Sequence, residues 1–229
     1  MKLTRTRLML AMALGLAVGT AQAHDDSGKT GGDISHVNGG ITAEAGQQYG
    51  DLDTVNGGIS VRRGAIARNV ETVNGGITLE DEAQVQSAET VNGGITAGER
   101  VRVGHGAETV NGGIKFGFNS SVQGDVTTVN GGITIKQTEV SGQLQTVSGD
   151  ITVGAKSHVR GGIHVEKPHG ISFGRSRTPR IVIGPNAVVD GELRFDRTVE
   201  LFVHQTAKIG PVVGATAQSW TTSLPARND

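Results

Sequence analysis

Acidic side chains gather in one short stretch late in the chain, and they are the first candidates for catalysis. Enzymes that cleave polysaccharides hold two carboxyl groups on one face, one as acid and one as base or nucleophile. Alternation along an extended strand sends Asp190 and Glu192 to the same outward face. A solvated rim accounts for the group without any chemistry, so we predict no catalytic residue. The group consists of Asp190, Glu192, Asp196 and Glu200.

Histidines are the other candidates for chemistry. None of the seven has the spacing of a metal site, although His158 and His164 can share a face. A calcium-binding β-roll repeats Gly-Gly-x-Gly-x-Asp, and only Asp150 lies in a similar context. No phosphate-binding loop or Ser/His/Asp arrangement is visible in the sequence. We therefore predict no metal and no cofactor.

The residues with the most regular spacing belong to a repeated pentapeptide, Val-Asn-Gly-Gly-Ile. A seventh, altered copy reads Val-Ser-Gly-Asp-Ile, and the valines follow one another at steps of 18 or 19 residues. A fixed period of this size is typical of stacked-repeat architectures. The copies lie at 37–41, 55–59, 73–77, 91–95, 110–114, 129–133 and 147–151.

Two polar residue types recur at this period. If each repeat is one coil of a stack, the asparagines lie above one another and can bond as an amide ladder. The alternative is a flat polar face that binds a glycan, a second copy of the chain, or ice. The asparagines are Asn38, Asn56, Asn74, Asn92, Asn111 and Asn130, and the threonines before the valine are Thr54, Thr72, Thr90, Thr109, Thr128 and Thr146.

Apolar residues predict the elements that carry these rows. The valine, the first glycine, the isoleucine and the residue two positions after it alternate, which predicts a strand with these positions buried and Thr and Asn on the opposite face. A second apolar cluster, such as Val101 with Val103, predicts a further short strand in each repeat. The fold class we expect is all-β, a single-stranded parallel β-helix with coils of about 18 residues. A set of β-hairpins, with Asn-Gly at the turns, is the alternative.

Composition agrees with a solenoid. Aromatic residues make up only 3% of the chain and 36 residues are glycine, which suits coils that bury small side chains against their neighbours. The chain has no cysteine, so neither a disulfide nor a lipid-modified cysteine is available.

The chain divides into four predicted segments. Residues 1–23 have basic residues, an apolar run and an Ala-Gln-Ala site, typical of a signal peptide that is cleaved before His24. Residues 24–32 form a flexible lead-in, residues 33–215 the β-helix, and residues 216–229 a polar tail or a cap that contains Trp220. Cleavage removes three of the 21 Lys and Arg and none of the 22 Asp and Glu, which leaves a net charge of −4. Neither nucleic-acid binding nor a transmembrane segment in the mature chain is expected.

The Thr-Val-Asn-Gly-Gly-Ile-Thr units behind a leader resemble a bacterial exported family of β-strand repeats classed as adhesins of unknown function. The stretch 181–193 is similar to bactofilins, which are polymer-forming β-helix proteins. Together the resemblance covers about residues 33–215. It implies a β-helix that assembles or adheres, and it brings no catalytic residue.

The function we expect is that of a non-catalytic exported β-helix, a structural, adhesin-like or self-assembling module of the bacterial envelope. Its location is the periplasm, the outer-membrane surface or the outside, and its partners are itself or an envelope or extracellular glycan. The alternatives are a β-helix that binds or degrades polysaccharide and, ranked lower, an ice-binding protein that uses the threonine rows.

Overall fold

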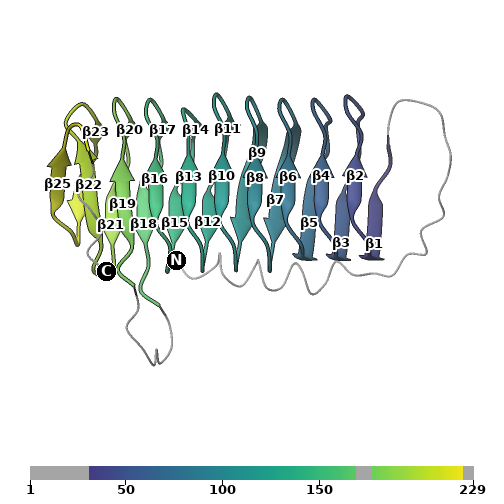
Figure 1. Ribbon diagram of the computed structural model, residues 1–229, viewed down its shortest axis with the longest axis horizontal. Helices are drawn as coiled ribbons and strands as arrows, with labels where there is room; N and C mark the ends of the chain where they lie inside the picture. Colours follow the sequence, from purple (N-terminus) through teal and green to yellow (C-terminus); the bar gives the residue numbers. More distant parts are fainter. Residues whose placement is uncertain (1–30, 169–176, 224–229) are drawn as a thin grey trace.

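The repeats form a parallel β-solenoid. The computed structural model describes residues 31–168 and 177–223, and in this part of the chain all regular elements are strands, in about nine turns of about 19 residues each. Figure 1 shows the coils side by side in chain order along the longest axis of the molecule, from β1 to β25. The predicted fold class is confirmed.

Sheet A is formed by the strand before each Asn-Gly-Gly and by the second apolar cluster of each repeat. From β11 onward the sheet has two columns of short strands, and both pair with β9. The undivided part contains β1 (Ile34–Asn38), β3 (Leu52–Asn56), β5 (Asn69–Asn74), β7 (Gln84–Thr90) and β9 (Arg102–Thr109). One column contains β11 (Ser121–Val122), β14 (Glu139–Val140), β17 (His158–Val159), β20 (Val188–Val189) and β23 (Lys208–Ile209). The other contains β12 (Val126–Thr128), β15 (Leu144–Thr146), β18 (Ile163–Val165), β21 (Leu193–Phe195) and β24 (Val212–Val213).

Sheet B is formed by the strand after each Gly-Gly, and it is a single run of ten strands. Its strands are β2 (Ile41–Ala43), β4 (Ile59–Val61), β6 (Ile77–Leu79), β8 (Ile95–Ala97), β10 (Ile114–Phe116), β13 (Ile133–Ile135), β16 (Ile151–Val153), β19 (Arg180–Ile183), β22 (Glu200–His204) and β25 (Ala217–Trp220).

Every strand pairs in parallel with the equivalent strand of the neighbouring coil. In sheet B, Ile77 pairs with Ile59 on one side and Ile95 on the other, one repeat away in each direction. Hairpins would pair consecutive strands antiparallel, so the hairpin alternative is wrong. The second strand predicted in each repeat is confirmed from β11 onward, where Val122 lies in a strand of its own. In the earlier coils the second apolar cluster forms isolated bridges, as at Ile66, or lies within an undivided strand, as Val103 does in β9.

The core runs the length of the solenoid between the two sheets. From β2 to β16, the first and last residues of each sheet B strand are buried, as Ile77 and Leu79 are, and sheet A adds buried apolar residues such as Val70. Identical or similar side chains therefore lie above one another, and burial of this apolar surface is the main source of stability.

The predicted division into faces is partly wrong. Thr72 is buried, whereas Val73 faces outward from β5 and is partly exposed. The predicted alternation of buried and exposed residues from the valine to the isoleucine is wrong. The chain turns at Asn-Gly-Gly, and a new strand begins at Ile77. The phase of burial is reset at each turn.

The C-terminal end extends beyond the predicted boundary at residue 215. Strand β25 pairs in register with β22, so residues 217–220 belong to the solenoid. The Trp220 ring packs edge-on against the His204 ring, with 4.6 Å between the ring centroids. Its Nε1 donates to Ile183 O at 3.3 Å. Trp220 is therefore an ordered residue of the last coil. The predicted signal peptide, 1–23, and most of the lead-in, 24–32, lie outside the described residues.

Candidate functional site

The six asparagines form a continuous amide ladder. Each Asn from the second to the sixth donates from Nδ2 to Oδ1 of the Asn one coil before it, at 2.9–3.0 Å. The side chains lie at the turn between sheets A and B and are exposed. Since these amides bond to one another along the stack, the structural interpretation of the row is confirmed.

The six threonines face inward, not toward solvent. Thr72 Oγ1, for example, donates to Gly57 O in the preceding coil at 2.8 Å, and the other five make the equivalent bond at 2.7–3.2 Å. Each of these threonines is at most 5% exposed. The predicted outward Thr row is wrong, and these hydroxyls cannot form an ice-binding face. Another hydroxyl row, with Thr78 and Thr96, does face outward from sheet B.

The first glycine of the pentapeptide allows the coils to approach each other closely. A Cβ on Gly75 would lie 2.0 Å from Gly57 O, whereas one on Gly76 would have its nearest neighbour, Gly94 O, at 3.2 Å. Any side chain at the first position would push two coils apart. Internal copies of the motif therefore need this glycine for space.

A row of carboxylates crosses the outward face of sheet A. Asp53, Glu71, Glu89 and Glu108 are paired in register on four neighbouring strands, β3, β5, β7 and β9. Neighbouring strands lie about 4.8 Å apart, so these four acids, here called the carboxylate row, stack closely. Each is only partly exposed.

Burial and mutual repulsion make the carboxylate row hard to ionise. Burial, and then the charges of Glu89 and Asp53, raises the pKa of Glu71 to about 7. The pKa of Asp53, Glu89 and Glu108 is also raised, in each case by burial first and by a neighbouring carboxylate second. Within residues 31–168 and 177–223, no member of the row takes part in an ion pair.

The acids beside the row are better compensated. Arg68 reaches Asp33 at 2.8 Å and Asp51 at 3.1 Å. Asn69 donates from Nδ2 to Asp51 Oδ1 at 3.0 Å, and its own Oδ1 accepts from Ser87. The Arg68 guanidinium therefore forms its ion pairs with Asp33 and Asp51 and none with the carboxylate row.

Valines run alongside the carboxylate row on the same face. They are the first residues of the pentapeptides, two positions after the acids, and alternation brings them to the outer surface. Val37 is 52% exposed, and the next five are partly exposed. This valine row consists of Val37, Val55, Val73, Val91, Val110 and Val129.

The carboxylate row changes character in the C-terminal half. The same column continues in register through Thr127, Gln145, His164 and Arg194. His164 Nε2 lies 2.8 Å from Asp196 Oδ2, and Arg194 Nε donates to Asp196 Oδ1 at 3.0 Å. These two bonds lower the pKa of Asp196, that of His164 having the larger effect.

The acids that lie close together in the sequence, from Asp190 to Glu200, have separate partners in the structure. Asp190 bonds His158 at 2.6 Å and Asp196 bonds His164, while Glu200 pairs in register with Arg180 on another sheet. The acids are thus divided between separate histidine partners and two sheets. Among the described residues, no cluster of three or more His, Asp or Glu has the geometry to hold a metal ion.

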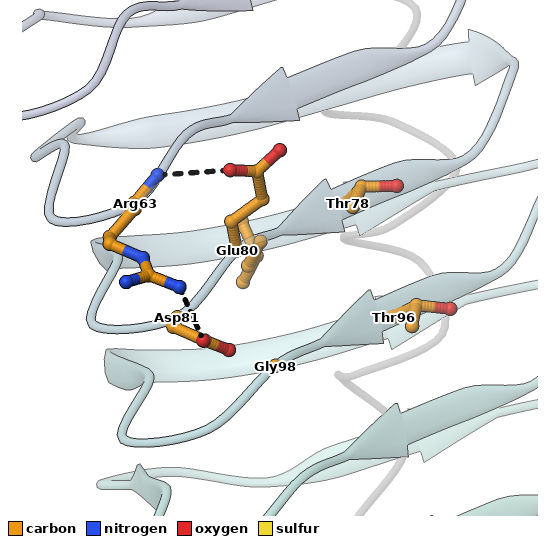
Figure 2. A pocket seen from close by; sticks show the side chains of 7 residues that line it. Arg63, Thr78, Glu80, Asp81, Thr96 and Gly98 are labelled. Atoms are coloured by element: carbon orange, nitrogen blue, oxygen red, sulfur yellow. Dashed lines mark hydrogen bonds and ion pairs between the residues drawn. The ribbon is translucent and has the colours of Figure 1, made fainter.

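A shallow hollow of about 330 Å³ lies at the corner that follows sheet B. Figure 2 shows Arg63 reaching across it to Asp81, with Nη2 donating at 3.2 Å, while the Arg63 backbone N–H donates to Glu80 at 3.2 Å. Thr78 and Thr96, on two neighbouring strands of sheet B, also line it. The charged groups of the hollow, Arg63, Glu80 and Asp81, are thus joined to one another across neighbouring coils.

Comparisons with known proteins add no name to this geometry. No protein-family model matches the chain, and neither curated proteins nor solved structures contain a match. The described residues also include no helix long and apolar enough to cross a membrane.

Sequence reasoning missed the carboxylate row, although the signal was present. An acid stands two residues before the valine in four consecutive repeats, at the coil period. The density of acids along the chain does not reveal such a row, because a solenoid brings together residues that are one coil apart. The row is the most distinctive chemical feature of the described surface.

Proposed function

We propose that the protein is a non-catalytic structural module of the bacterial envelope that assembles with itself. The observation that carries this proposal is that the repeated polar side chains bond one coil to the next, as Asn74 bonds Asn56 and Thr72 bonds Gly57. Side chains used in this way build a rigid rod and offer little for catalysis. Adhesin-like binding of a surface or glycan is part of the same proposal.

The N-terminal coil supports the self-assembly part. In the described chain β1 pairs only with β3, and β2 only with β4, so the main-chain groups on the other side of both strands are unpaired. Edge strands of this kind pair readily with another chain. Export is proposed from the leader-like residues 1–23, and the resemblance to adhesin-type repeats and bactofilins agrees with both parts.

Sedimentation and electron microscopy of the purified protein test the assembly. We expect species that grow with protein concentration, because edge and face contacts are both available. A strictly monomeric protein at high concentration would remove the self-assembly proposal. Sequencing the N-terminus of the protein isolated from cell fractions tests export, and the expected first residue is His24.

A β-solenoid that binds or degrades polysaccharide is the second candidate, and the carboxylate row favours it. Adjacent carboxyl groups about 5 Å apart suit a retaining glycosidase, and a raised pKa such as that of Glu71, about 7, suits a general acid. Incubation with envelope polysaccharides, wild type against Glu71→Gln, tests this. Turnover that Glu71→Gln abolishes would establish an enzyme, and turnover lost only with Asp190→Asn would place the site elsewhere.

A further inference from the structure

The two halves of the solenoid differ in charge. Residues 33–130 contain 12 Asp and Glu against 6 Lys and Arg, a net charge of −6. The described residues 131–168 and 177–223 contain 7 against 9, a net charge of +2. On the outward face of sheet A the same division appears, with the carboxylate row in the first half and His164 and Arg194 in the second. The molecule is therefore electrically polarised along its axis.

The carboxylate row restricts what can cover this face. Its four acids are partly buried and have no ion-pair partner among the described residues, so an acidic cover would add to their repulsion. A cover that brings positive charge would relieve it. The valine row beside the acids supplies apolar surface for the same contact.

We propose that a second copy of this chain covers the face, with the two A sheets packed together and the two solenoids antiparallel. The twofold axis runs along the strand direction, between the levels of Glu108 and Thr127. Such an axis keeps each column opposite the same column and reverses the order of the coils. The facing pairs are Asp53 with Arg194, Glu71 with His164, Glu89 with Gln145, and Glu108 with Thr127. This inference rests on the proposed self-assembly and assigns its surface.

Electrostatics selects the antiparallel arrangement. A twofold axis along the solenoid would set the four acids of one copy against the same four of the other, and like charges in contact are strongly unfavourable. In the antiparallel arrangement no acid of this row faces another. Asp196 offsets part of the positive charge of Arg194, but the Arg194 side chain remains 57% exposed and available for Asp53.

The face has the size of a stable interface. About nine turns at about 4.8 Å each, by a strand of about five residues at about 3.3 Å each, give about 700 Å² per copy. Specific complexes bury about 800 Å² per partner.

Charge exchange tests the pairing. Sedimentation velocity of the purified protein in low salt at mildly alkaline pH should give a dimer that weakens as salt is added. Asp53→Lys and Arg194→Glu should each weaken dimerisation by about tenfold or more, because each sets like charges in contact. The double variant Asp53→Lys/Arg194→Glu should restore it. Lys115→Glu, on the outward face of sheet B, is the matched control and should leave the dimer unchanged.

Crosslinking tests the axis. The chain has no cysteine, so Thr127→Cys introduces a single reactive site. A short bismaleimide should join two copies through Cys at this position, and it should not do so in Thr96→Cys, on sheet B. Thermal unfolding of every variant shows that the fold is retained.

The outcomes separate this inference from the proposed function. Filaments that are unaffected by Asp53→Lys and Arg194→Glu would overturn the face-to-face dimer and leave self-assembly standing. A dimer that crosslinks equally through Thr96→Cys would also overturn it. A monomer under all conditions would overturn both proposals.

Discussion

Asn74 donates from Nδ2 to Oδ1 of Asn56 over 2.9 Å, and the two residues are one coil apart. Asn74 Oδ1 in turn accepts from Asn92 at 2.9 Å. Bonds in such a chain polarise one another, so an interior member contributes more than an end member. The ladder thus links six consecutive coils along one edge of the solenoid.

Replacing an interior asparagine should cost more stability than replacing the first one. Asn74→Ala removes two side-chain bonds, and we expect a loss of about 1–3 kcal/mol in the free energy of unfolding, at about 0.5–1.5 kcal/mol per bond. Asn38→Ala removes the one ladder bond in which Asn38 takes part and should cost about half as much. Denaturant titration measures both, and equal losses would contradict a cooperative ladder.

The two neighbouring glycines of one repeat should respond differently to alanine. Gly75→Ala places a Cβ 2.0 Å from a backbone oxygen of the preceding coil, so we expect a loss of about 3 kcal/mol or more, or no folded protein. Gly76→Ala meets its nearest atom at 3.2 Å and should be tolerated with a smaller loss. Circular dichroism with thermal melting compares the two, and the reverse order would refute the close-approach explanation.

Buried and exposed threonines provide a similar pair. Thr72→Val removes the hydroxyl that donates to Gly57 O and should destabilise the protein by about 1–2 kcal/mol. Thr78→Val, on the outward face of sheet B, should change stability by less than about 0.5 kcal/mol. Parallel denaturant titrations check this, and a larger effect at Thr78 would show that the outward row has a structural role.

The carboxylate row should make the protein more stable in mild acid. The pKa of Glu71 is about 7 in the folded state, above the 4.5 of an ordinary Glu, so folding favours the protonated form. The cost of ionising Glu71, which comes from burial first and from repulsion second, is absent below pH about 4.5 and develops as the pH rises toward about 7. Glu71→Gln should therefore stabilise the protein by about 1–2 kcal/mol at pH 8, after allowance for partial exposure, and change little at pH about 4.

Denaturant unfolding of the wild type and of Glu71→Gln, measured from pH about 4 to pH 8, tests this prediction. The matched control is Glu99→Gln, an exposed acid outside the row, which should show no such gain at alkaline pH. A Glu71→Gln protein with the same pH profile as the wild type would show that Glu71 ionises freely.

Several features of the fold could be predicted from the sequence because they depend only on the coil period. Residues at the same place in each repeat must lie above one another in a parallel stack, so the Asn column followed directly from the spacing of Asn38, Asn56 and Asn74. The separate second strand of the later repeats, such as β11 with Val122, is likewise predicted from the apolar positions alone. Neither feature depends on how the coil bends.

The faces could not be predicted, because they depend on the turns within a coil. Thr72 and Val73 exchange the sides we predicted for them, since the strand ends at Asn74 and alternation does not continue through Gly75 and Gly76. The alternation of buried and exposed residues along a strand cannot be continued through a turn, because the sequence pattern does not give the angle of that turn.

The sequence by itself determined the parallel solenoid, its period and its amide ladder, because a repeated sequence forces equivalent residues into register. Only the tertiary structure decided which column faces water. It placed the threonines inside and the carboxylate and valine rows outside, because the bend at Asn-Gly-Gly fixes the direction of each side chain. The shape of each coil therefore decides which rows form the candidate surface, and the spacing of residues along the sequence does not give that shape.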